Sequence, residues 1–425
     1  MAFFSNPLQR EAAPHGVVPT LRAVARGRDS TASTPPDGYD IRLFSDLNKA
    51  EHDWRRLEEQ GHGSVYQTYD WCASWCDVFI KNERSKPCIV IGYIEGEPSV
   101  LLPLYRTTNR LGLRNLKFIG DHHANIRLPM VHEGRRAAAD DWLASGAFLN
   151  QLRHLCRAEG VADHITLACM AKRFAGQPNT LIGARAAVCH DAIFTINLRD
   201  DFDQLMNERR GKAYKKKFRS KTRALEQIGP IRFSKAQSAD EIESALRLFF
   251  EQKRVRFNEL RLFNRFVYPD DRRFLLELAR QSYTSGRPSL EVYCLNVGDE
   301  KAAIFATGRF RNTVSGAVHS MTSAKQIAER SPGEVILNRL IKTCCEEGVE
   351  QFDLGFGDAR YKQAWCDTGR LYDVSTAVTV PGHLIAIAHK FALRTRRVLL
   401  RSPRVAEVIR RVRYSVMQIR RRLGS

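Results

Sequence analysis

No apolar run in this chain is long enough to cross a membrane. A membrane-spanning helix needs about 18 consecutive apolar residues, and the best C-terminal candidate, 384–393, is interrupted by His389 and Lys390. The first residues carry no basic stretch ahead of an apolar core, so they do not resemble an export signal. Of the 425 residues, 43% are hydrophobic and 27% are charged, which is the balance of a soluble globular protein. We therefore expect a cytoplasmic protein.

Paired metal-binding cysteine motifs are also absent. The ten cysteines fall mostly inside apolar patterns, where a free thiol behaves as a small hydrophobe. Cys72 and Cys76 share a helix face, and Cys344 adjoins Cys345. Neither pair has the CxxC spacing or the partner histidines of a zinc site. The sequence predicts reduced cysteines and no metal.

Acidic residues are scarce in two strongly basic segments. The net charge is +20, and the chain from Lys390 onward holds 12 basic residues against one acid, Glu407. Residues 209–223 include nine basic residues and no acid. Because a solvated helix face usually mixes both signs, we expect 209–223 to meet phosphate, on a nucleotide-linked sugar, a lipid headgroup, a carrier's pyrophosphate or RNA. Its candidate substrate-binding residues are Lys212, Lys215 and Arg219.

The order of elements indicates two successive α/β halves, since the chain is too long for one ordinary core. Residues 1–38 are rich in proline and lack periodicity, which predicts a disordered leader. Residues 39–200 alternate strands and helices, 201–381 repeat that order, and 382–425 form a basic helical tail. The expected elements include helices 140–159, 203–227, 239–260, 270–285, 333–347 and 359–366, and strands 289–297, 301–311, 313–322, 350–356 and 373–380.

The most informative stretch is Phe352–Trp365, FDLGFGDARYKQAW, read together with Ser331–Glu334 upstream. An apolar strand runs into a glycine-kinked loop that carries an Asp, a Tyr and a Lys. The upstream Ser-Pro-Gly opens a helix whose free N–H groups could hold an anion. These two motifs resemble the C-terminal half of the BioF2-like acyltransferases, a family of the Gcn5-related N-acetyltransferase (GNAT) superfamily that includes proteins labelled as cellulose-biosynthesis CelD.

The resemblance extends over roughly residues 40–380. The basic segment 209–223, followed by LEQIG, is similar to the family's central helix. The N-terminal landmarks follow in the family's order: Trp54–Leu57, Tyr66–Trp71, Leu102–Leu104 and Phe118–Asp121. The resemblance implies tandem GNAT-like domains, as in the Fem peptidyl transferases, with central mixed sheets flanked by helices in an α/β (α+β) fold.

The resemblance also implies a thioester donor, acetyl-CoA or a longer acyl-CoA, held at the helix that follows Ser331. The loop before this helix has fewer glycines than the donor-binding loop of many superfamily members. Lys325 and Arg330 would therefore have to help hold the donor's phosphates by their charge. The alternative is an ordinary capped helix with proline at its first position. The expected acyl-CoA-binding residues are Ser331, Gly333, Glu334, Val335, Lys325 and Arg330.

Four residues are candidates for the chemistry. They are Tyr361, Asp353, Lys362 and His319. Tyr361 occupies the place where many superfamily members protonate the leaving thiolate, although it is also placed to pack beside Trp365. Asp353, in an apolar strand, is costly to bury unless it pairs with Lys362 or Arg360, so a structural ion pair and a catalytic base both stay open.

The fourth candidate is His319, on the strand before the donor loop. Its ordinary pKa near 6.5 suits a base that receives the amine's proton, and a hydrogen-bonded core histidine is the alternative. Asp121 and His122 are expected to line the acceptor cleft from the first half. If His122 and His123 lie on one strand, they face opposite ways.

Together these features predict an N-acyltransferase that moves an acyl group from acyl-CoA to an amine of an envelope precursor, such as an amino sugar of an exopolysaccharide. The tail 390–425 is basic and amphipathic, which predicts either binding to an anionic membrane surface or packing across the domains. A sphingoid-type lipid amine is an alternative acceptor. A Fem-like use of aminoacyl-tRNA, or a non-catalytic RNA- or nucleotide-binding protein on this scaffold, also stays open.

Overall fold

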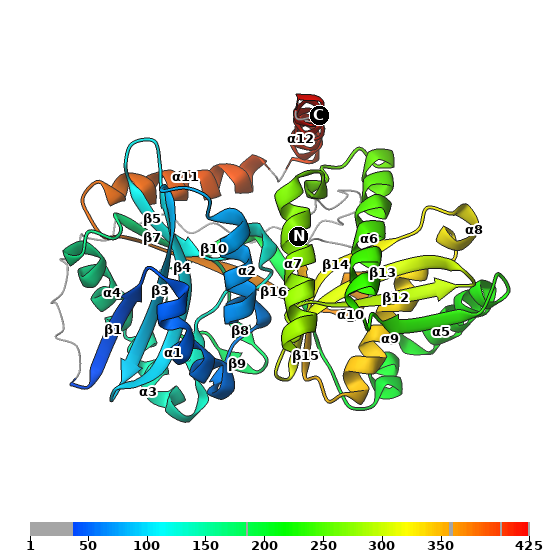
Figure 1. Cartoon of the computed structure of the whole chain (residues 1–425), viewed down its shortest axis with the longest axis horizontal. Helices are drawn as coiled ribbons and strands as arrows, with labels where there is room; N and C mark the ends of the chain where they lie inside the picture. Colours follow the sequence, from blue (N-terminus) through cyan, green and yellow to red (C-terminus); the bar gives the residue numbers. More distant parts are fainter. Residues whose placement is uncertain (1–36, 184–185, 357–359, 400–401, 424–425) are drawn as a thin grey trace, which may run out of the picture.

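The computed structural model describes residues 37–183, 186–356, 360–399 and 402–423, and it has two α/β halves side by side (Figure 1). The leader and the loop 357–359 lie outside the described residues. Within the described chain, 14 strands form one mixed sheet whose main path is β1-β3-β4-β5-β7-β16-β10-β15-β14-β13-β12-β11. The fold is therefore the tandem α/β arrangement that the sequence predicts.

The strands of the two halves follow the same plan. Those of the first half are β1 Tyr39–Phe44, β3 Ser85–Ile94, β4 Glu97–Thr108, β5 Arg114–Phe118 and β7 His164–Ala171. Those of the second are β11 Ile231–Lys235, β12 Glu291–Val297, β13 Glu300–Phe310, β14 Thr313–Met321 and β15 Gln351–Phe356. The short strands are β2 Gly61–His62, β6 Met130–His132, β8 Arg173–Phe174 and β9 Gln177–Pro178.

Among the described strands, each half contains one parallel ladder, and the remaining ladders are antiparallel. Strands β5 and β7 are parallel over Asn115–Lys117, and β14 and β15 are parallel over Thr313–Ser315. This shared placement reveals a duplication that the residues themselves do not display.

The two halves exchange their last strands. Strand β10 (Ala187–Asn197) pairs with β15 of the second half, and β16 (Asp367–Ala377) pairs with β7 of the first. The two exchanged strands also pair with each other, which joins the halves into one sheet. The expected strand 373–380 is wrong in its bounds: β16 begins and ends earlier. It begins earlier because its N-terminal part pairs with β10. The boundary at residue 200 stays a prediction.

The helices cover both faces of the sheet. In the first half they are α1 Leu47–Gln60, α2 Tyr69–Phe79, α3 Arg136–Ala144 and α4 Ala147–Ala158. In the second they are α5 Phe202–Glu226, α6 Ala239–Glu259, α7 Pro269–Ser285, α8 Lys325–Ala328, α9 Pro332–Glu346 and α10 Arg360–Trp365. Single 3₁₀ turns are η1 Val65–Gln67, η2 Asp121–His123, η3 Glu133–Arg135 and η4 Arg265–Val267.

Two glycines interrupt helices that the sequence predicts to be continuous. The expected helix 140–159 is wrong: Gly146, at φ 79°, divides it into α3 and α4. Gly211, at φ 75°, kinks α5. Both residues adopt left-handed backbone, which only glycine reaches without strain.

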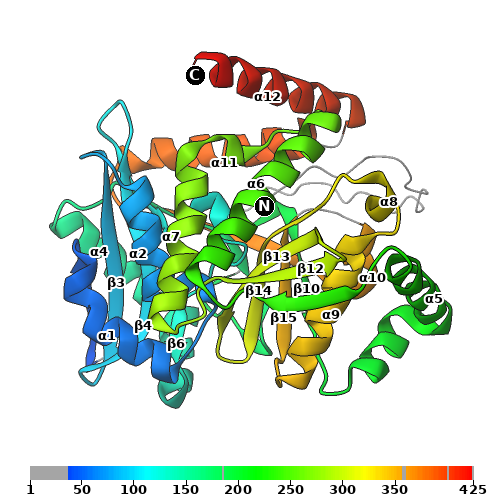
Figure 2. The ribbon, with the colours of Figure 1, turned by 45° about the vertical axis from the view of Figure 1, so that its right-hand side comes forward.

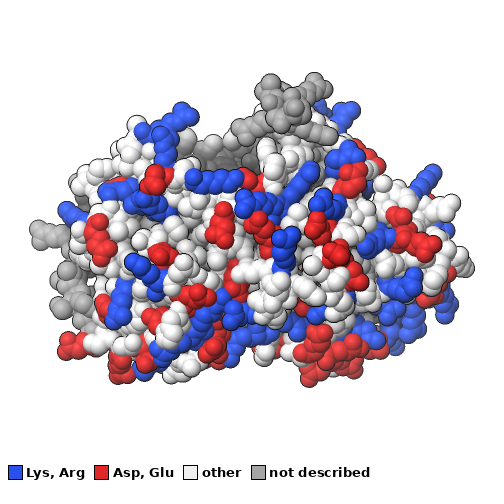
Figure 3. Space-filling model, in the orientation of Figure 1, with Lys and Arg blue, Asp and Glu red and all other residues white. Residues whose placement is uncertain are grey.

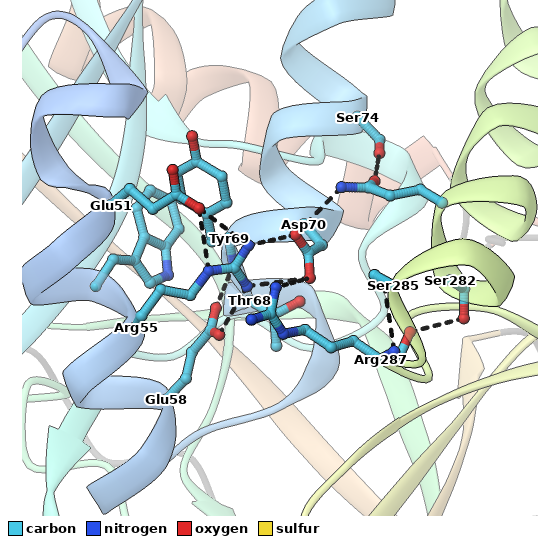
Figure 4. Close-up of polar contacts among 12 residues, drawn as sticks. Glu51, Arg55, Glu58, Thr68, Tyr69, Asp70, Ser74, Ser282, Ser285 and Arg287 are labelled. Atoms are coloured by element: carbon cyan, nitrogen blue, oxygen red, sulfur yellow. Dashed lines mark hydrogen bonds and ion pairs between the residues drawn. The ribbon is translucent and has the colours of Figure 1, made fainter.

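Helices α2 and α7 join the halves. Trp71 of α2 meets Phe274 of α7 edge-on at 5.3 Å. Beside this contact, the buried carboxylate of Asp70 receives hydrogen bonds from Arg55 of α1 and Gln281 of α7, and Arg287 lies 3.6 Å away (Figure 4). Three elements thus converge on one carboxylate at the junction.

The C-terminal tail forms α11 (Gly382–Leu399) and α12 (Pro403–Leu423). Helix α11 packs on β16, β10 and β7, and α12 crosses above it (Figure 2). Helix α12 is anchored by Met417, which is buried and accepts a hydrogen bond from the Asn264 amide at 3.1 Å. Among the described residues, no helix is both long and apolar enough to span a bilayer.

Candidate active site

The candidate site lies where β14 and β15 separate. The two strands pair only from Thr313 to Ser315 on β14, opposite Gln351 to Asp353 on β15. Beyond this point the first half inserts the side chain of Asn125, whose Nδ2 donates to Gly316 O at 2.9 Å. A Cβ atom at Gly355 would lie 2.6 Å from the Asn125 amide, and Gly355 has φ 74°. Only glycine fits there.

Asp353 is fully buried in this opening. Its Oδ1 accepts the Gly355 amide at 2.6 Å. Burial raises the pKa of Asp353 to about 6, although the Gly355 N–H and the charge of Lys362 act in the opposite direction. Burial, and then the charge of Asp353, raise the pKa of Tyr66 on η1 well above its usual value. Asp353 is thus a carboxylate that changes charge near neutral pH.

Three nitrogen-bearing side chains gather at the same opening: Lys253 of α6, His319 of β14 and Lys362 of α10. The Lys362 ammonium donates to Phe356 O at the end of β15. Burial and the nearby charge of Lys362 lower the pKa of Lys253 to about 8. Burial and both lysines also lower the pKa of His319 well below its usual range. We name Lys253, His319 and Lys362 the nitrogen cluster.

The structure thus brings three predicted residues together: Asp353, His319 and Lys362. His319 is held neutral, which makes it a weaker base than its ordinary pKa suggests. The side chain of Tyr361 lies outside the described residues, and its backbone opens α10 beside Lys362. Its role as proton donor stays a prediction.

Sequence reasoning missed Lys253. The signal was present, because Lys253 follows Phe249 and Phe250 and precedes Phe257 at helical spacing, and all three phenylalanines are buried. A lysine within the apolar stripe of a helix is desolvated, and desolvation lowers its pKa. Asn125 gave no comparable signal, because no pattern in the neighbouring sequence shows that its side chain contacts Gly316 in the second half.

The start of α9 is lined by cations from α5. Ser331 precedes α9 at φ 58°, and its Oγ accepts from Lys221 at 3.2 Å. Lys221 also binds Glu334, and Arg210 lies 3.5 Å from the same carboxylate. Although burial opposes it, the Lys221 hydrogen bond holds the pKa of Glu334 below its usual value. An anion at this helix start would compete with Glu334 for these two cations.

The other predicted donor-binding residues differ in their surroundings. The amides of Glu334 and Val335 bond to Ser331 O at 3.0 and 3.4 Å, and the Val335 side chain is fully buried. A Cβ atom at Gly333 would meet Met321 Sδ at 3.5 Å, an ordinary contact. Lys325 is exposed on α8, and Arg330 bonds to Gln326 O. Whether these residues hold a donor stays a prediction.

The predicted phosphate-binding residues Lys212, Lys215 and Arg219 line a hollow of about 950 Å³ on α5. Lysines and arginines gather over α5 at the lower right of Figure 3. Lys215 pairs with Asp203 at 2.5 Å. No residue of β14 or β15 lines this hollow, so it is separate from the nitrogen cluster.

The predicted acceptor residues Asp121 and His122 lie on η2, not on a strand. The opposite orientation expected of His122 and His123 on one strand therefore does not apply, and their ring centroids are 4.2 Å apart. His123 Nε2 lies 2.9 Å from Asp271 Oδ1. Both histidines line a cavity of about 20 Å³ beside Val318 of β14, which has room for about one water.

Comparisons with known proteins point to the second half. Residues 212–363 match the family model of an acetyltransferase (GNAT) domain, and no curated protein sequence matches the chain. A solved structure of FemX has a TM-score of 0.55 at 10% identity, covering 81% of this chain and 99% of that one. The C-terminal domain of a putative lysylphosphatidylglycerol synthetase from Agrobacterium fabrum has a TM-score of 0.47 at 10% identity, covering 82% and 97%. A tandem GNAT protein from the clavulanic acid biosynthesis pathway has a TM-score of 0.40 at 10% identity, covering 80% and 98%.

The matched residues contain the whole nitrogen cluster and Asp353. FemX shares the fold over most of both chains. The narrower resemblance to BioF2-like and CelD proteins stays a prediction. The chain has a GNAT-like fold, and residues 212–363 resemble a GNAT acetyltransferase domain, which supports a transferase.

Proposed function

We propose that the protein is an acyl-CoA-dependent N-acyltransferase whose acceptor is the amine of an amino sugar in an envelope precursor. The observation that carries this proposal is the nitrogen cluster beside Asp353, where two strands of the matched GNAT domain separate. Acyl transfer develops negative charge on the thioester oxygen, and preorganised cations in a buried site stabilise such charge.

In the proposed mechanism the amine attacks the thioester carbon, so a C–N bond forms and the carbonyl oxygen becomes an oxyanion. Lys253 and Lys362 stabilise that oxyanion. Neutral His319 takes the proton that the amine loses. The oxyanion then reforms the carbonyl as the C–S bond breaks, and Tyr361 donates a proton to the departing thiolate. Transfer of the proton from His319 to Tyr361 through solvent restores both residues. Asp353, whose charge interacts with that of Lys362, offsets part of the positive charge of the site.

A Fem-like use of aminoacyl-tRNA is the second candidate. It is favoured by the basic hollow on α5, which is open and lined by five lysine and arginine residues, and by the fold shared with FemX. In this case the leaving group is a tRNA hydroxyl, and the cations of the nitrogen cluster serve the same oxyanion.

Donor binding separates the two candidates. Titration of the full-length protein with acetyl-CoA and longer acyl-CoAs is expected to give saturable binding and, with an amino-sugar acceptor, release of free CoA thiol. Consumption of aminoacyl-tRNA without affinity for acyl-CoA would establish the Fem-like alternative. Activity with neither donor would favour a non-catalytic binding protein.

The acceptor is best identified in cells. Mass spectrometry of envelope polysaccharide and lipid from a deletion strain is expected to reveal a missing N-acyl group on an amino sugar. A missing group on a lipid amine would instead identify a sphingoid-type acceptor. An unchanged polysaccharide and lipid profile would contradict an envelope substrate.

We also propose that the tail holds the enzyme on the cytoplasmic face of an anionic membrane. Although α11 packs on the sheet, its residues Leu384, Ile387 and Phe391 are 63–70% exposed at helical spacing. On α12, Val408 and Val412 are also exposed, among arginines. Apolar side chains flanked by arginines suit an interfacial helix.

Removal of α12 is expected to weaken binding to anionic vesicles by at least tenfold, since each basic residue near the surface contributes about 1 kcal/mol. Flotation with and without added salt measures the loss, and activity on a soluble acceptor is the control. If the intact protein does not float and the truncated one only melts at a lower temperature, the tail is structural.

A further inference from the structure

Three neighbouring strands lose their regular register at one level of the sheet. The β7·β16 ladder shifts between Tyr372 and Val374, and the β10·β16 ladder shifts between Val188 and Ala192. On β7, Cys169 has left-handed backbone at φ 56°, which is rare for residues other than glycine. Such bulges turn a side chain away from its regular direction and are frequent beside functional sites.

The irregular register brings together residues that are far apart in sequence. One ligand atom from each of Cys169, Cys189 and Asp373 lies within 4.8 Å of the others. Asp373 Oδ1 accepts the Cys169 amide at 2.7 Å and the Cys189 thiol at 2.6 Å. Its other oxygen, Oδ2, lies 3.2 Å from Nε2 of His389 on α11. The carboxylate is therefore held by the Cys169 amide, the Cys189 thiol and the His389 imidazole, with the Cys169 thiol close by.

These two cysteines differ from the remaining eight. All ten are free thiols, but Cys169 and Cys189 are the two that are partly exposed, and the others are buried. Asp373 is 4% exposed. A carboxylate at such depth requires partners for its charge. The cluster thus joins the two least deeply buried cysteines of the chain to an enclosed carboxylate.

We propose that Cys169, Cys189 and Asp373 bind a zinc ion, with His389 orienting the carboxylate from behind. Two thiolates and a carboxylate are ligands that Zn²⁺ accepts, and thiolates select it over Mg²⁺ or Ca²⁺. A histidine against the second carboxylate oxygen is the kind of outer partner that metal ligands normally have. The fourth position of the ion is left to water.

Binding requires a small local opening. Zinc ligands at about 2.3 Å for sulfur and 2.0–2.2 Å for oxygen stand about 3.5 Å apart on a tetrahedral ion, whereas Cys189 Sγ and Asp373 Oδ1 are 2.6 Å apart. Rotation of the partly exposed thiols provides this space. The ion would link four elements at one point: the exchanged strands β10 and β16, strand β7 and helix α11. This point is separate from the nitrogen cluster.

The test uses full-length protein, purified under reducing conditions and titrated with Zn²⁺ against a chromophoric chelator. We expect one equivalent of bound zinc, and Co²⁺ in its place should show thiolate-to-metal charge-transfer absorption. Cys189→Ser and Asp373→Asn are expected to abolish stoichiometric binding. His389→Gln should weaken it by about 10- to 100-fold, and His383→Gln, on the same helix, should bind as the unaltered protein does.

A second readout guards against variants that misfold. Zinc is expected to slow proteolysis of the α11–α12 tail in the unaltered protein and in His383→Gln, but not in Cys189→Ser. Failure of the unaltered, reduced protein to bind an equivalent of zinc would overturn the proposal. So would a Cys169–Cys189 disulfide in freshly isolated protein, which would identify the pair as a redox site.

Discussion

The two halves of the sheet share one plan but place different chemistry at their parallel pairs. In the first half, the β5·β7 pair holds His164, whose Nδ1 lies 3.2 Å from Asn115 Oδ1 and whose Nε2 lies 3.0 Å from Ser375 Oγ. Burial lowers the pKa of His164 to about 4, so the ring stays neutral among neutral partners. In the second half, the corresponding pair holds Asp353, which is buried near the charge of Lys362.

This difference supports the second half as the place of the proposed reaction. Both ring nitrogens of His164 have neutral hydrogen-bond partners, and its lowered pKa keeps this histidine uncharged near neutral pH. The second half keeps Asp353, Lys253 and His319 with displaced pKa values, and such clusters are typical of active sites. The first half contributes Asn125 to the opening and thereby shapes the site from outside.

The largest effect is expected from Tyr361→Phe. Removing the hydroxyl should lower kcat by roughly ten- to a thousandfold, since general acid catalysis contributes that much, while the affinity for acyl-CoA stays nearly unchanged. Tyr372→Phe, on β16, is the control. Steady-state kinetics and donor titration measure both, and unaltered turnover in Tyr361→Phe would mean that another group or water protonates the thiolate.

Lys253→Met tests whether the nitrogen cluster works through its charge. Because the pKa of Lys253 is about 8, the ammonium is lost as pH rises through that value, so the rate should fall there. The methionine variant is expected to be roughly tenfold slower and to lack this limb of the pH–rate profile. Arg254→Met, exposed on the same helix, should retain it. A wild-type rate that rises through pH 8 would instead make neutral Lys253 the base.

Asp353→Asn against Thr166→Val compares the two parallel pairs directly. The pKa of Asp353 is raised from 3.8 to about 6, so the folded state binds more protons than the unfolded state between these values. The free energy of unfolding should therefore fall as pH rises from 4 to 6, by up to roughly 3 kcal/mol.

Asp353→Asn should remove that dependence. Thr166→Val, on β7, should lower stability by about 1 kcal/mol at every pH and leave turnover unchanged. Urea denaturation at several pH values measures both variants. If the free energy of unfolding of the unaltered protein does not change between pH 4 and 6, the pKa of Asp353 is not raised by burial.

The smallest effect is expected from Asn125→Ala. Losing its hydrogen bond to Gly316 should lower the free energy of unfolding by about 1–2 kcal/mol and turnover only severalfold, because Asn125 shapes the opening without reacting. Asn312→Ala, an exposed amide that bonds to Glu350, should change stability by less than about 0.5 kcal/mol. Equal losses in both variants would place Asn125 outside the site.

The sequence predicted most elements of the second half, because hydrophobic periodicity and cap residues are local signals. It also named Asp353, His319 and Lys362 as candidates, and paired Asp353 with Lys362, because these residues lie on or beside strands that local patterns identify. The sequence did not predict the exchange of β10 and β16, because no local pattern determines a pairing between His164 and Ala377. Cys169, Cys189 and Asp373 come together only through that exchange. Their spacing in the sequence therefore gave no sign of the proposed metal site.

The strand exchange also bears on how the protein is made. Strand β16 lies beside β7, so the ribosome must reach residue 377 before the first half can complete its sheet. At ordinary rates of synthesis, β7 presents an open edge for roughly 10–40 seconds, and an open edge invites pairing with other chains. A nascent chain of this kind suits protection by a chaperone. Splitting the gene between its halves would yield two polypeptides that each lack a native strand.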